Sequence, residues 1–266
     1  LLLLEGNGVE KNYDEAIKYL KQAADQGDTS AQNRYGMILE SEKKYKEAVE
    51  YYKKSSELGN PLALNNLGRL YHKGHGVEQD YSKAFEYFEK AAELNNTSGI
   101  MNLGHLCLNG NGVEQDCSKA IEYFEKAAEL NEPSGLYYLG YSYMYGKNVE
   151  QDYSKAIQYF ERSSELGYAE AFLDLGSIYE NVKNVDKDYS KAIEYYKRAG
   201  ELGHSEAFYK IGCIYKNEYN DEQNFSEAIK YFEKACELGD IDASYELYYL
   251  YSNGERVEQN LSKAFY

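Results

Sequence analysis

One sixteen-residue stretch recurs along the chain and limits its fold more than any other feature. The stretch reads DYSKAFEYFEKAAELN at 80–95, and its central alanine returns at Ala16, Ala48, Ala84, Ala120, Ala156, Ala192, Ala228 and Ala264. The last seven alanines are 36 residues apart, and the first interval is 32 because the loop at 40–44 is shorter. A period of this length is typical of solenoids, in which each unit packs only on its neighbours. We therefore predict an array of repeats.

Each unit is predicted to contain two antiparallel helices joined by a short loop. The first helix, as in 61–73, carries Leu64, Leu67, Leu70 and Tyr71. Spacings of three and four place these side chains on one face of an α-helix. We expect that face to be buried.

Two columns of small residues mark the first helix. One holds alanine or glycine at Ala31, Ala63, Gly99, Gly135, Ala171, Ala207 and Ala243, and the other holds a glycine five positions later at Gly36, Gly68, Gly104, Gly140, Gly176 and Gly212. A glycine inside a helix costs about 1 kcal/mol relative to alanine, so its regular return requires a packing reason. We expect two helix backbones to approach closely there. Tyr248 replaces this glycine in the last unit, which predicts splayed helices or a distorted terminal repeat.

The loop after the first helix reads Gly-x-Gly-Val at 74–77 and 110–113. Glycine permits the positive φ that often ends a helix. Asparagine tolerates this conformation best among other residues, and it takes the second glycine's place at Asn148, Asn184 and Asn220. No third glycine follows at the required spacing, so the loop does not match a phosphate-binding motif.

The second helix is predicted from its capping residues. It begins after a residue of N-cap type at Asp80, Asp116, Asp152, Asp188, Asn224 and Asn260, and it ends at Gly59, Gly167, Gly203 and Gly239 or at Asn95 and Asn131. Its inner face is predicted to consist of Ala84, Tyr87, Phe88, Ala91 and Leu94.

The charge of the chain argues against nucleic acid as a partner. Acidic residues outnumber basic ones by 45 to 29, which gives a formal net charge of −16. The lysines and arginines are spread among the repeats, so no basic patch offsets the repulsion of a phosphate backbone. No apolar run approaches the roughly 18 residues that cross a bilayer. We expect neither nucleic-acid binding nor membrane insertion.

The sequence contains no pattern that indicates catalysis, a cofactor or a metal site. Serines and acids recur with the period, as at Ser82 and Ser118, which marks them as fold residues. The four histidines have no H-x-x-x-H spacing and no cysteine beside them. Each cysteine occupies a packing column, so we interpret all four as packing residues, with a disulfide between Cys107 and Cys117 as the alternative. We therefore predict a protein that is not an enzyme.

The repeat pattern resembles the Sel1-like repeat family, which belongs to the tetratricopeptide superfamily. The resemblance rests on L-G in the first helix, G-x-G-V in the loop and D-Y-S-K-A-x-x-Y-F-x-K-A-A-E-L-G in the second helix. It implies an all-α fold, a right-handed α-α superhelix of antiparallel helix hairpins, over a single array at 1–266. We expect partial units at 1–29 and 242–266 and complete units at 30–61, 62–97, 98–133, 134–169, 170–205 and 206–241.

The resemblance also implies a binding role. Relatives act as adaptors, and in the superfamily the first helices line a concave groove. We expect a scaffold or adaptor that binds a peptide or partner protein in this groove. The alternatives are a structural curved spacer in a large assembly and a regulatory module of a longer protein. A secreted, cysteine-rich branch of the family has a disulfide between the position of Cys236 and the position eight residues later. The second position is Ser244 in this chain, so we do not expect it to belong to that branch.

First-helix positions that vary between units are the candidates for groove contacts. They change from polar to aromatic along the chain, and tyrosine is enriched at binding surfaces. A second hypothesis is that Arg69, His72 and His105 receive a carboxylate or an acidic peptide. Since the chain has 31 tyrosines, part of the aromatic pattern is composition. The candidates are Asn65, Arg69, His72, Met101, His105, Tyr137, Tyr141, Tyr145, Tyr209, Tyr245 and Tyr249.

Two further expectations concern the ends and the compartment. Leu1 aligns with the end of a first helix and Tyr266 follows the start of a second, so we expect a fragment of a longer array. Exposed terminal cores would then self-associate or fray. Unpaired cysteines suit a reducing compartment. We expect a cytoplasmic location, with the endoplasmic reticulum lumen as the alternative that the resemblance suggests.

Overall fold

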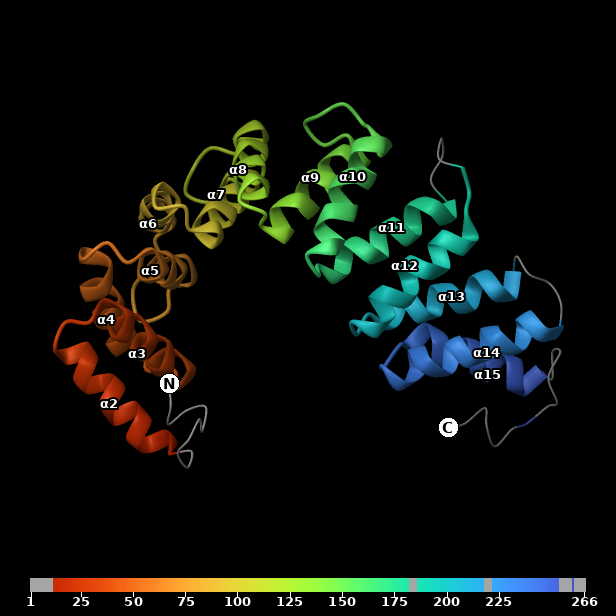
Figure 1. Ribbon diagram of the computed structural model, residues 1–266, viewed down its shortest axis with the longest axis horizontal. Coiled ribbons are helices and arrows are strands. Elements are labelled where there is room, and N and C mark those ends of the chain that lie inside the picture. The colour runs from red at the N-terminus through yellow and green to blue at the C-terminus, as the bar shows by residue number, and fades with distance from the viewer. Residues whose placement is uncertain (1–11, 182–185, 218–221, 254–259, 261–266) are drawn as a thin grey trace. The chain divides into compact units, whose positions relative to one another are not determined.

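The structure is a computed structural model that describes residues 12–181, 186–217, 222–253 and Asn260. Helices and short connections account for all of these residues, and the described segments contain no strand. Consecutive helices run as antiparallel hairpins (Figure 1). The predicted all-α class and the helix-hairpin repeat are confirmed.

The chain divides into two compact units, Leu1–Gly135 and Leu136–Tyr266. The first unit contains α2 (Tyr13–Asp25), α3 (Thr29–Ser41), α4 (Tyr45–Glu57), α5 (Pro61–Lys73), α6 (Tyr81–Glu93), α7 (Thr97–Asn109) and α8 (Cys117–Glu129). The boundary falls inside α9 (Pro133–Tyr145). The second unit continues with α10 (Tyr153–Glu165), α11 (Ala169–Asn181), α12 (Tyr189–Glu201), α13 (Ser205–Asn217), α14 (Glu222–Glu237) and α15 (Ile241–Asn253).

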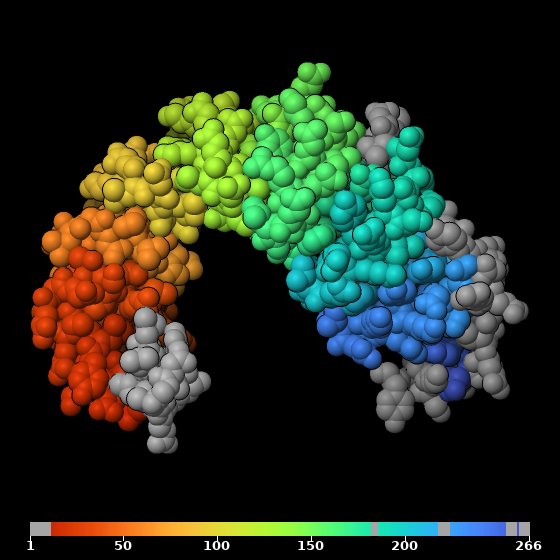
Figure 2. All heavy atoms as spheres, viewed as in Figure 1, coloured from red at the N-terminus to blue at the C-terminus, as the bar shows by residue number. Residues whose placement is uncertain are grey.

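Each repeat packs on the next within its unit. The first helix of a hairpin packs on its own second helix, as α5 does on α6, and the second helix packs on the following first helix, as α6 does on α7. In the space-filling view the atoms of consecutive repeats lie in direct contact within each unit (Figure 2). The core therefore extends along the repeats as a series of similar layers.

An aromatic ring explains the recurring mid-helix glycine. The rings of the second helix lie so close that a β-carbon at the glycine would be 2.5–2.8 Å from them. The pairs are Gly36 with Tyr52, Gly68 with Phe88, Gly104 with Phe124, Gly140 with Phe160, Gly176 with Tyr196 and Gly212 with Phe232. The predicted backbone-to-backbone approach occurs at Gly68, where a β-carbon would also be 3.2 Å from the Ala84 carbonyl oxygen, but throughout this column the nearest atoms belong to a ring. The hairpin that Tyr248 was predicted to distort continues into residues outside those described.

Backbones do approach closely at the other small-residue column. A β-carbon at Gly99 would be 2.8 Å from the Ala91 β-carbon and 3.2 Å from the Phe88 carbonyl oxygen. Gly135 has the same relation to α8, and the alanine copies Ala63, Ala171, Ala207 and Ala243 are fully buried. This column sets the distance between a second helix and the following first helix.

Most of the predicted helix ends are confirmed. The side chains of Asp80, Asp116, Asp152 and Asp188 each accept a hydrogen bond from the backbone N–H three residues later. The helix-ending Gly59, Gly167, Gly203, Gly239, Asn95 and Asn131 all have positive φ. Asn224 was wrongly predicted as an N-cap, because α14 begins earlier, at Glu222. The backbone N–H of Asn260 bonds Tyr251, as that of Asp80 bonds Tyr71.

The loop conformation is also confirmed where the structure describes it. Gly74, Gly76, Gly110 and Gly112 have φ between 69° and 75°, and Asn148 has a φ of 62°. A β-carbon at Gly76 would be 2.6 Å from the carbonyl carbon of Tyr45. The loop therefore packs its second glycine against the start of the preceding repeat's second helix. Asn184 and Asn220 lie outside the described residues.

One predicted core position is exposed. Leu94 was assigned to the inner face of its helix but is 49% exposed. It is the C-cap residue, with φ −91° and ψ 18°, and its backbone no longer follows the helical face. The same column is exposed in the other repeats, at Leu58, Leu130, Leu166, Leu202 and Leu238. All four cysteines are free thiols, and Cys107 is buried.

Candidate protein-binding surface

The predicted groove residues all lie on first helices, and we call the accessible parts of these helices the first-helix surface. In the first unit, Asn65, Arg69 and His72 belong to α5, and Met101 and His105 belong to α7. In the second unit the residues are Tyr137, Tyr141 and Tyr145 on α9, Tyr209 on α13, and Tyr245 and Tyr249 on α15. The surface has different chemistry in the two units.

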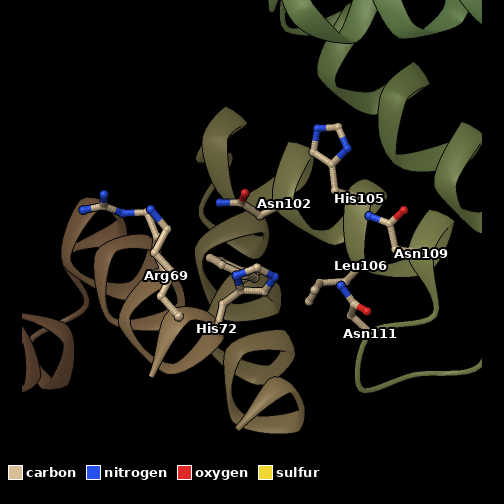
Figure 3. A pocket seen from close by; sticks show the side chains of 9 residues that line it. Arg69, His72, Asn102, His105, Leu106, Asn109 and Asn111 are labelled. Atoms are coloured by element: carbon tan, nitrogen blue, oxygen red, sulfur yellow. The ribbon is translucent and has the colours of Figure 1, made fainter. Parts of the chain in front are cut away.

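A pocket in the first unit brings three of the predicted residues together. It encloses about 320 Å³ between α5 and α7 (Figure 3). Its lining contains Arg69, His72, Lys73, Phe88, Asn102, His105, Leu106, Asn109 and Asn111. No carboxylate is among these residues, although acids predominate in the chain.

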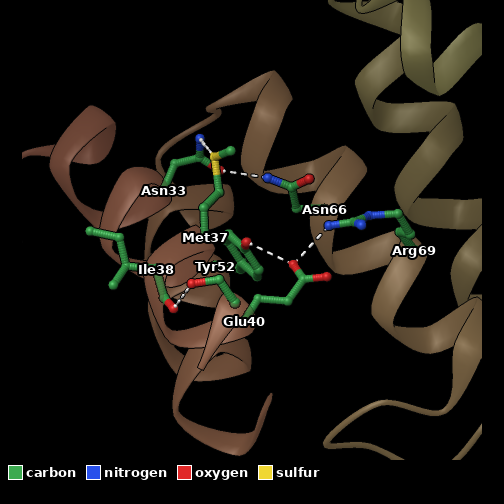
Figure 4. Close-up of polar contacts among 8 residues, drawn as sticks. Asn33, Met37, Ile38, Glu40, Tyr52, Asn66 and Arg69 are labelled. Carbon is green, nitrogen blue, oxygen red and sulfur yellow. Dashed lines mark hydrogen bonds and ion pairs between the residues drawn. The ribbon is translucent and has the colours of Figure 1, made fainter. Parts of the chain in front are cut away.

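Arg69 turns its charged end away from the pocket. Its guanidinium lies 2.7 Å from the Glu40 carboxylate, which also accepts a hydrogen bond of 3.0 Å from the Tyr52 hydroxyl (Figure 4). The Glu40 side chain is only 17% exposed. This ion pair neutralises Arg69 locally and links α3, α4 and α5. The remaining guanidinium N–H groups are the donors left for a ligand.

Asparagine side chains connect the first helices of adjacent repeats. The Asn66 amide donates to the Asn33 carbonyl oxygen at 3.0 Å, as Figure 4 shows, and the Asn102 amide donates to the Asn65 carbonyl oxygen at 2.9 Å. An asparagine side chain has two N–H donors and an oxygen with two lone pairs, so each keeps further hydrogen-bonding capacity. A row of such groups matches the alternating donors and acceptors of an extended peptide backbone.

Burial keeps the two pocket histidines neutral over a wider pH range. It lowers the pKa of His105, and burial together with the nearby Lys73 charge lowers the pKa of His72. The His105 ring lies edge-on to Phe124, with centroids 5.6 Å apart. Neutral imidazoles offer one donor and one acceptor each. At neutral pH the pocket is therefore mainly a hydrogen-bonding site. Among its lining residues Arg69 is paired with Glu40, so Lys73 is the one full charge there without an ion-pair partner in the described part of the chain.

Met101 offers little surface for binding. It was predicted to face the groove, but it is only 7% exposed and packs in the core of the first unit. Asn65, one turn from the pocket on α5, is half-buried. The accessible candidates of this unit are therefore Asn65, Arg69, His72 and His105.

Tyr137 is partly a packing residue. Its ring centroid lies 5.6 Å from that of Phe160 and 4.9 Å from that of Tyr168. Its hydroxyl donates a hydrogen bond to Asp174, and burial together with this carboxylate raises the tyrosine's pKa strongly. Burial raises the pKa of the Asp174 carboxyl in turn. Part of this side chain is therefore used in packing and is not available to a ligand.

Tyr141 and Tyr145 form an accessible aromatic pair. Their ring centroids are 4.6 Å apart at an angle of 51°, and Tyr145 is 50% exposed. The ammonium group of Lys147 lies 4.8 Å from the Tyr141 centroid and 5.9 Å from the Tyr145 centroid. It also donates a hydrogen bond of 3.3 Å to the Tyr141 hydroxyl. This pair holds a cation from its own chain.

The remaining candidates lie farther along the second unit. Tyr209 packs its ring 5.8 Å from that of Phe232, and burial raises its pKa strongly. Tyr245 and Tyr249 on α15 are 69% and 46% exposed. The ring contacts found in the described segments do not connect these three tyrosines to the Tyr141–Tyr145 pair.

Several partners of the candidates were missed by the sequence analysis. Glu40, Lys147 and Asp174 each bond a predicted residue but were not predicted themselves. Lys147 stands in the loop column of His75 and Asn111, and Glu40 stands four residues after the repeat's glycine. Each residue differs from the one at the equivalent position of the preceding repeat, and this difference was the sequence signal that could have identified it.

The described segments contain no group of three or more histidine, cysteine or acidic side chains placed to hold a metal ion. None of the described helices combines the length and the apolar character that crossing a membrane requires.

Family models cover nearly the whole chain. The Sel1 repeat model matches residues 1–28, 61–96, 97–132, 133–168, 169–204, 205–240 and 241–266, and a tetratricopeptide repeat model matches residues 29–58. No curated protein sequence matches the chain.

Solved structures with the same fold include bacterial repeat proteins. A Sel1 repeat protein from Oxalobacter formigenes is 31% identical with a TM-score of 0.75, over 87% of this chain and 95% of that chain. The c5321 protective antigen of uropathogenic Escherichia coli is 26% identical with a TM-score of 0.69, over 99% of this chain and 65% of that chain. The immunity protein Pa5087 from Pseudomonas aeruginosa is 27% identical with a TM-score of 0.51, over 81% of this chain and 83% of that chain.

Proposed function

Since the chain belongs to the Sel1 repeat family, we propose that it is a scaffold that holds a peptide or a partner protein on its first-helix surface. Sel1 and tetratricopeptide repeats are generally protein-interaction scaffolds and are typically not catalytic. The family thus supports protein binding in general. The choice of the first-helix surface rests on the residues described above.

The pocket between α5 and α7 is the observation that carries this proposal. Fold residues of a repeat protein return with the period, whereas binding residues need not. Arg69, His105 and Tyr141 occupy equivalent positions in three successive repeats and have unrelated side chains. In the first unit these variable positions converge with asparagine amides on a cavity of about 320 Å³. The lining suits a peptide backbone with a polar side chain.

The lining of the pocket also indicates which kind of side chain it would bind. With Lys73 as a cationic donor, the asparagine amides as neutral donors and no lining carboxylate, it favours an acidic or amide side chain over a basic one. Charge-assisted hydrogen bonds to a carboxylate are about twice as strong as neutral ones. We infer that a partner places a glutamate, aspartate or amide side chain here.

Capture from an extract of the native source tests the proposal. The parent chain is tagged beside a variant with Asn102→Ala and His105→Ala, and beside a control with Lys90→Ala and Lys126→Ala on second helices. We expect the parent and the control to retain the same protein and the pocket variant to lose it. Circular dichroism and thermal unfolding verify that the pocket variant is folded.

One observation favours a second candidate, a structural spacer that binds along its second helices. The leucine column at the ends of these helices is 41–64% exposed in six repeats. Exposed leucines at regular intervals offer apolar contact outside the first-helix surface. In the capture experiment this function predicts that the pocket variant retains every partner and that a Leu94→Ser, Leu130→Ser variant loses them.

A further inference from the structure

The aromatic pair Tyr141–Tyr145 already contains a bound cation. The ammonium group of Lys147 lies over both rings and hydrogen-bonds the Tyr141 hydroxyl. The electron-rich faces of tyrosine rings attract lysine, arginine and quaternary ammonium groups. The pair and Lys147 are accessible, since Tyr145 is 50% exposed and Lys147 lies in the exposed loop after α9.

This contact differs from the cation–aromatic contacts that belong to the repeat. Lys83 over Tyr71, Lys155 over Tyr143 and Lys191 over Tyr179 recur at equivalent positions, with distances of 5.5, 4.9 and 4.9 Å. They join a second helix to the first helix of the same hairpin. Tyr141 and Tyr145, by contrast, replace His105 and Asn109 of the preceding repeat. The repeat therefore does not require this aromatic pair in order to fold.

Negative charge lies beside the pair. Asp174 of α11 accepts the hydrogen bond of Tyr137, whose ring centroid lies 6.5 Å from that of Tyr141. Burial raises the pKa of Tyr145, and the Asp174 charge adds to this. The charges of Glu170 and Glu206 raise the pKa of Asp174 in turn. The ion pairs found in the described segments do not include Asp174, Glu170 or Glu206. The Asp174 carboxylate, with two further carboxylates acting on it, adds a negative potential that attracts a second positive charge.

We propose that Tyr141, Tyr145 and Asp174 form a recognition site for a lysine or arginine side chain of a partner, and that Lys147 is an internal occupant which the partner's side chain displaces. This inference rests on the proposed role in protein binding and adds the chemistry of the partner. The first unit selects an acidic or amide side chain, and the second unit selects a basic one.

Displacing the occupant costs little free energy. A cation–aromatic contact at an exposed site contributes about 0.5–1 kcal/mol, which corresponds to an affinity change of about two- to five-fold. Displacing Lys147 returns its ammonium group to water, where it is well solvated, so the cost is limited to this amount. Removing Lys147 should therefore strengthen binding of an external cation by about two- to five-fold.

A defined peptide tests the site without knowledge of the natural partner. The probe is acetyl-Gly-Lys-Gly-Lys-Gly-amide, titrated into the whole chain with carbon-13 in its tyrosine rings and followed by nuclear magnetic resonance. A matched probe replaces both lysines with norleucine, which keeps the aliphatic stem and removes the charge. We expect the ring signals of Tyr141 and Tyr145 to shift and saturate with the lysine peptide alone.

Four variants separate the site from general electrostatic attraction. Lys147→Met should tighten binding of the lysine peptide, and Lys155→Met changes the net charge equally at a contact that belongs to the repeat. Tyr141→Phe keeps a ring and should retain binding, whereas Tyr141→Leu should lose it. Neither of the two tyrosine substitutions alters the charge of the chain, so any difference in their affinity for the peptide is due to the aromatic ring.

The proposal is overturned if Lys147→Met and Lys155→Met have equal effects, or if Tyr141→Leu binds the lysine peptide as the parent does. Saturable shifts with a matched glutamate peptide instead would also overturn it. Its failure differs from failure of the proposed function, because the capture experiment does not use the peptide. A captured partner with no peptide binding contradicts the cation site alone, and peptide binding with no captured partner contradicts the scaffold role alone.

Discussion

At the residue scale, a hydroxyl group distinguishes two copies of the ring that packs on the repeat's glycine. The Tyr52 hydroxyl donates to Glu40 at 3.0 Å, and the Tyr196 hydroxyl donates to Glu180 at 2.6 Å. The other described copies are Phe88, Phe124, Phe160 and Phe232, and the equivalents of the glutamate there are His72, Leu108, Met144 and Lys216. Among the described copies of this ring, a tyrosine thus replaces phenylalanine only where a carboxylate accepts the hydrogen bond of its hydroxyl.

This pairing predicts a specific non-additivity. Tyr196→Phe should lower the free energy of unfolding by about 1–3 kcal/mol, because Glu180 loses its donor within a largely buried contact. Adding Glu180→Met should recover much of the loss, since phenylalanine with methionine is the combination that Phe160 and Met144 already form. Urea denaturation of the two single variants and the double variant measures this. Simple addition of the two single effects would show that the hydroxyl and the carboxylate are not coupled.

The glycine under each ring makes a second prediction. Alanine in place of a mid-helix glycine normally stabilises a helix by about 1 kcal/mol. At Gly104 the new methyl group would be 2.5 Å from the Phe124 ring, and overpacking costs about 1–3 kcal/mol. Gly104→Ala should therefore destabilise the chain, as measured by urea denaturation.

A second substitution checks the cause. Phe124→Leu reduces the side chain that the methyl group meets, so Gly104→Ala should be less harmful in this background than in the parent. If Gly104→Ala stabilises the parent chain, the ring does not hold the position that the structure gives it.

Stability should also depend on His105 below neutral pH. Burial lowers the pKa of His105 below the 6.5 of an exposed imidazole, so the unfolded chain takes up the proton at higher pH. Protonation therefore favours unfolding, and stability is lost as pH falls through 6.5 towards the lower folded-state value. His105→Gln should reduce the loss between pH 7.5 and 5.5, as thermal unfolding at both values measures. Equal losses in parent and variant would contradict this burial.

The period of the sequence allowed residues to be assigned to columns before their contacts were known. The buried alanines and the small-residue column were predictable because each recurs with one kind of neighbour. The contacts of Arg69 with Glu40 and of Lys147 with Tyr141 were not predictable. Each occurs in one repeat, and no other repeat holds the same pair of residues at the equivalent positions. The binding residues are therefore the part of the structure that the period predicts least.

At the scale of elements, helix ends were the most predictable feature. N-cap aspartates and positive-φ glycines act locally, so their sequence signal does not depend on packing. Asn224 is the exception, since α14 begins at Glu222. In that repeat Asp221 replaces the loop valine, which supplies a residue of N-cap type earlier in the sequence.

The two loop glycines should differ in how well they tolerate alanine. Gly110 and Gly112 have φ of 69° and 75°, so alanine is strained at both by about 1 kcal/mol. At Gly112 the added carbon would also be 2.7 Å from the carbonyl carbon of Tyr81, whereas at Gly110 the nearest atom is the Gln115 β-carbon at 3.2 Å. Gly112→Ala should therefore destabilise the chain more than Gly110→Ala in urea denaturation.

The asparagine copy provides the control for these loops. Asn148 already has a φ of 62°, so Asn148→Gly should change the free energy of unfolding by less than either alanine substitution. Equal effects of Gly110→Ala and Gly112→Ala would mean that backbone conformation alone, and not contact with the preceding repeat, fixes the loop.

At the scale of the whole molecule, each described repeat contacts mainly its neighbours. Such an array keeps its core without using the variable positions of the first helices, and these positions are therefore available for binding. The first unit offers amides, neutral imidazoles and a lysine there, and the second offers tyrosines and carboxylates. The central claim is that a partner is bound by these first-helix positions.

Hydrogen exchange of the chain with and without a captured partner tests this claim most directly. Amides of α5, α7 and α9 should exchange more slowly in the complex, while those of α6, α8 and α10 remain as in the free chain. Slower exchange confined to the ends of the second helices, around Leu94, Leu130 and Leu166, would contradict the claim and support the spacer function.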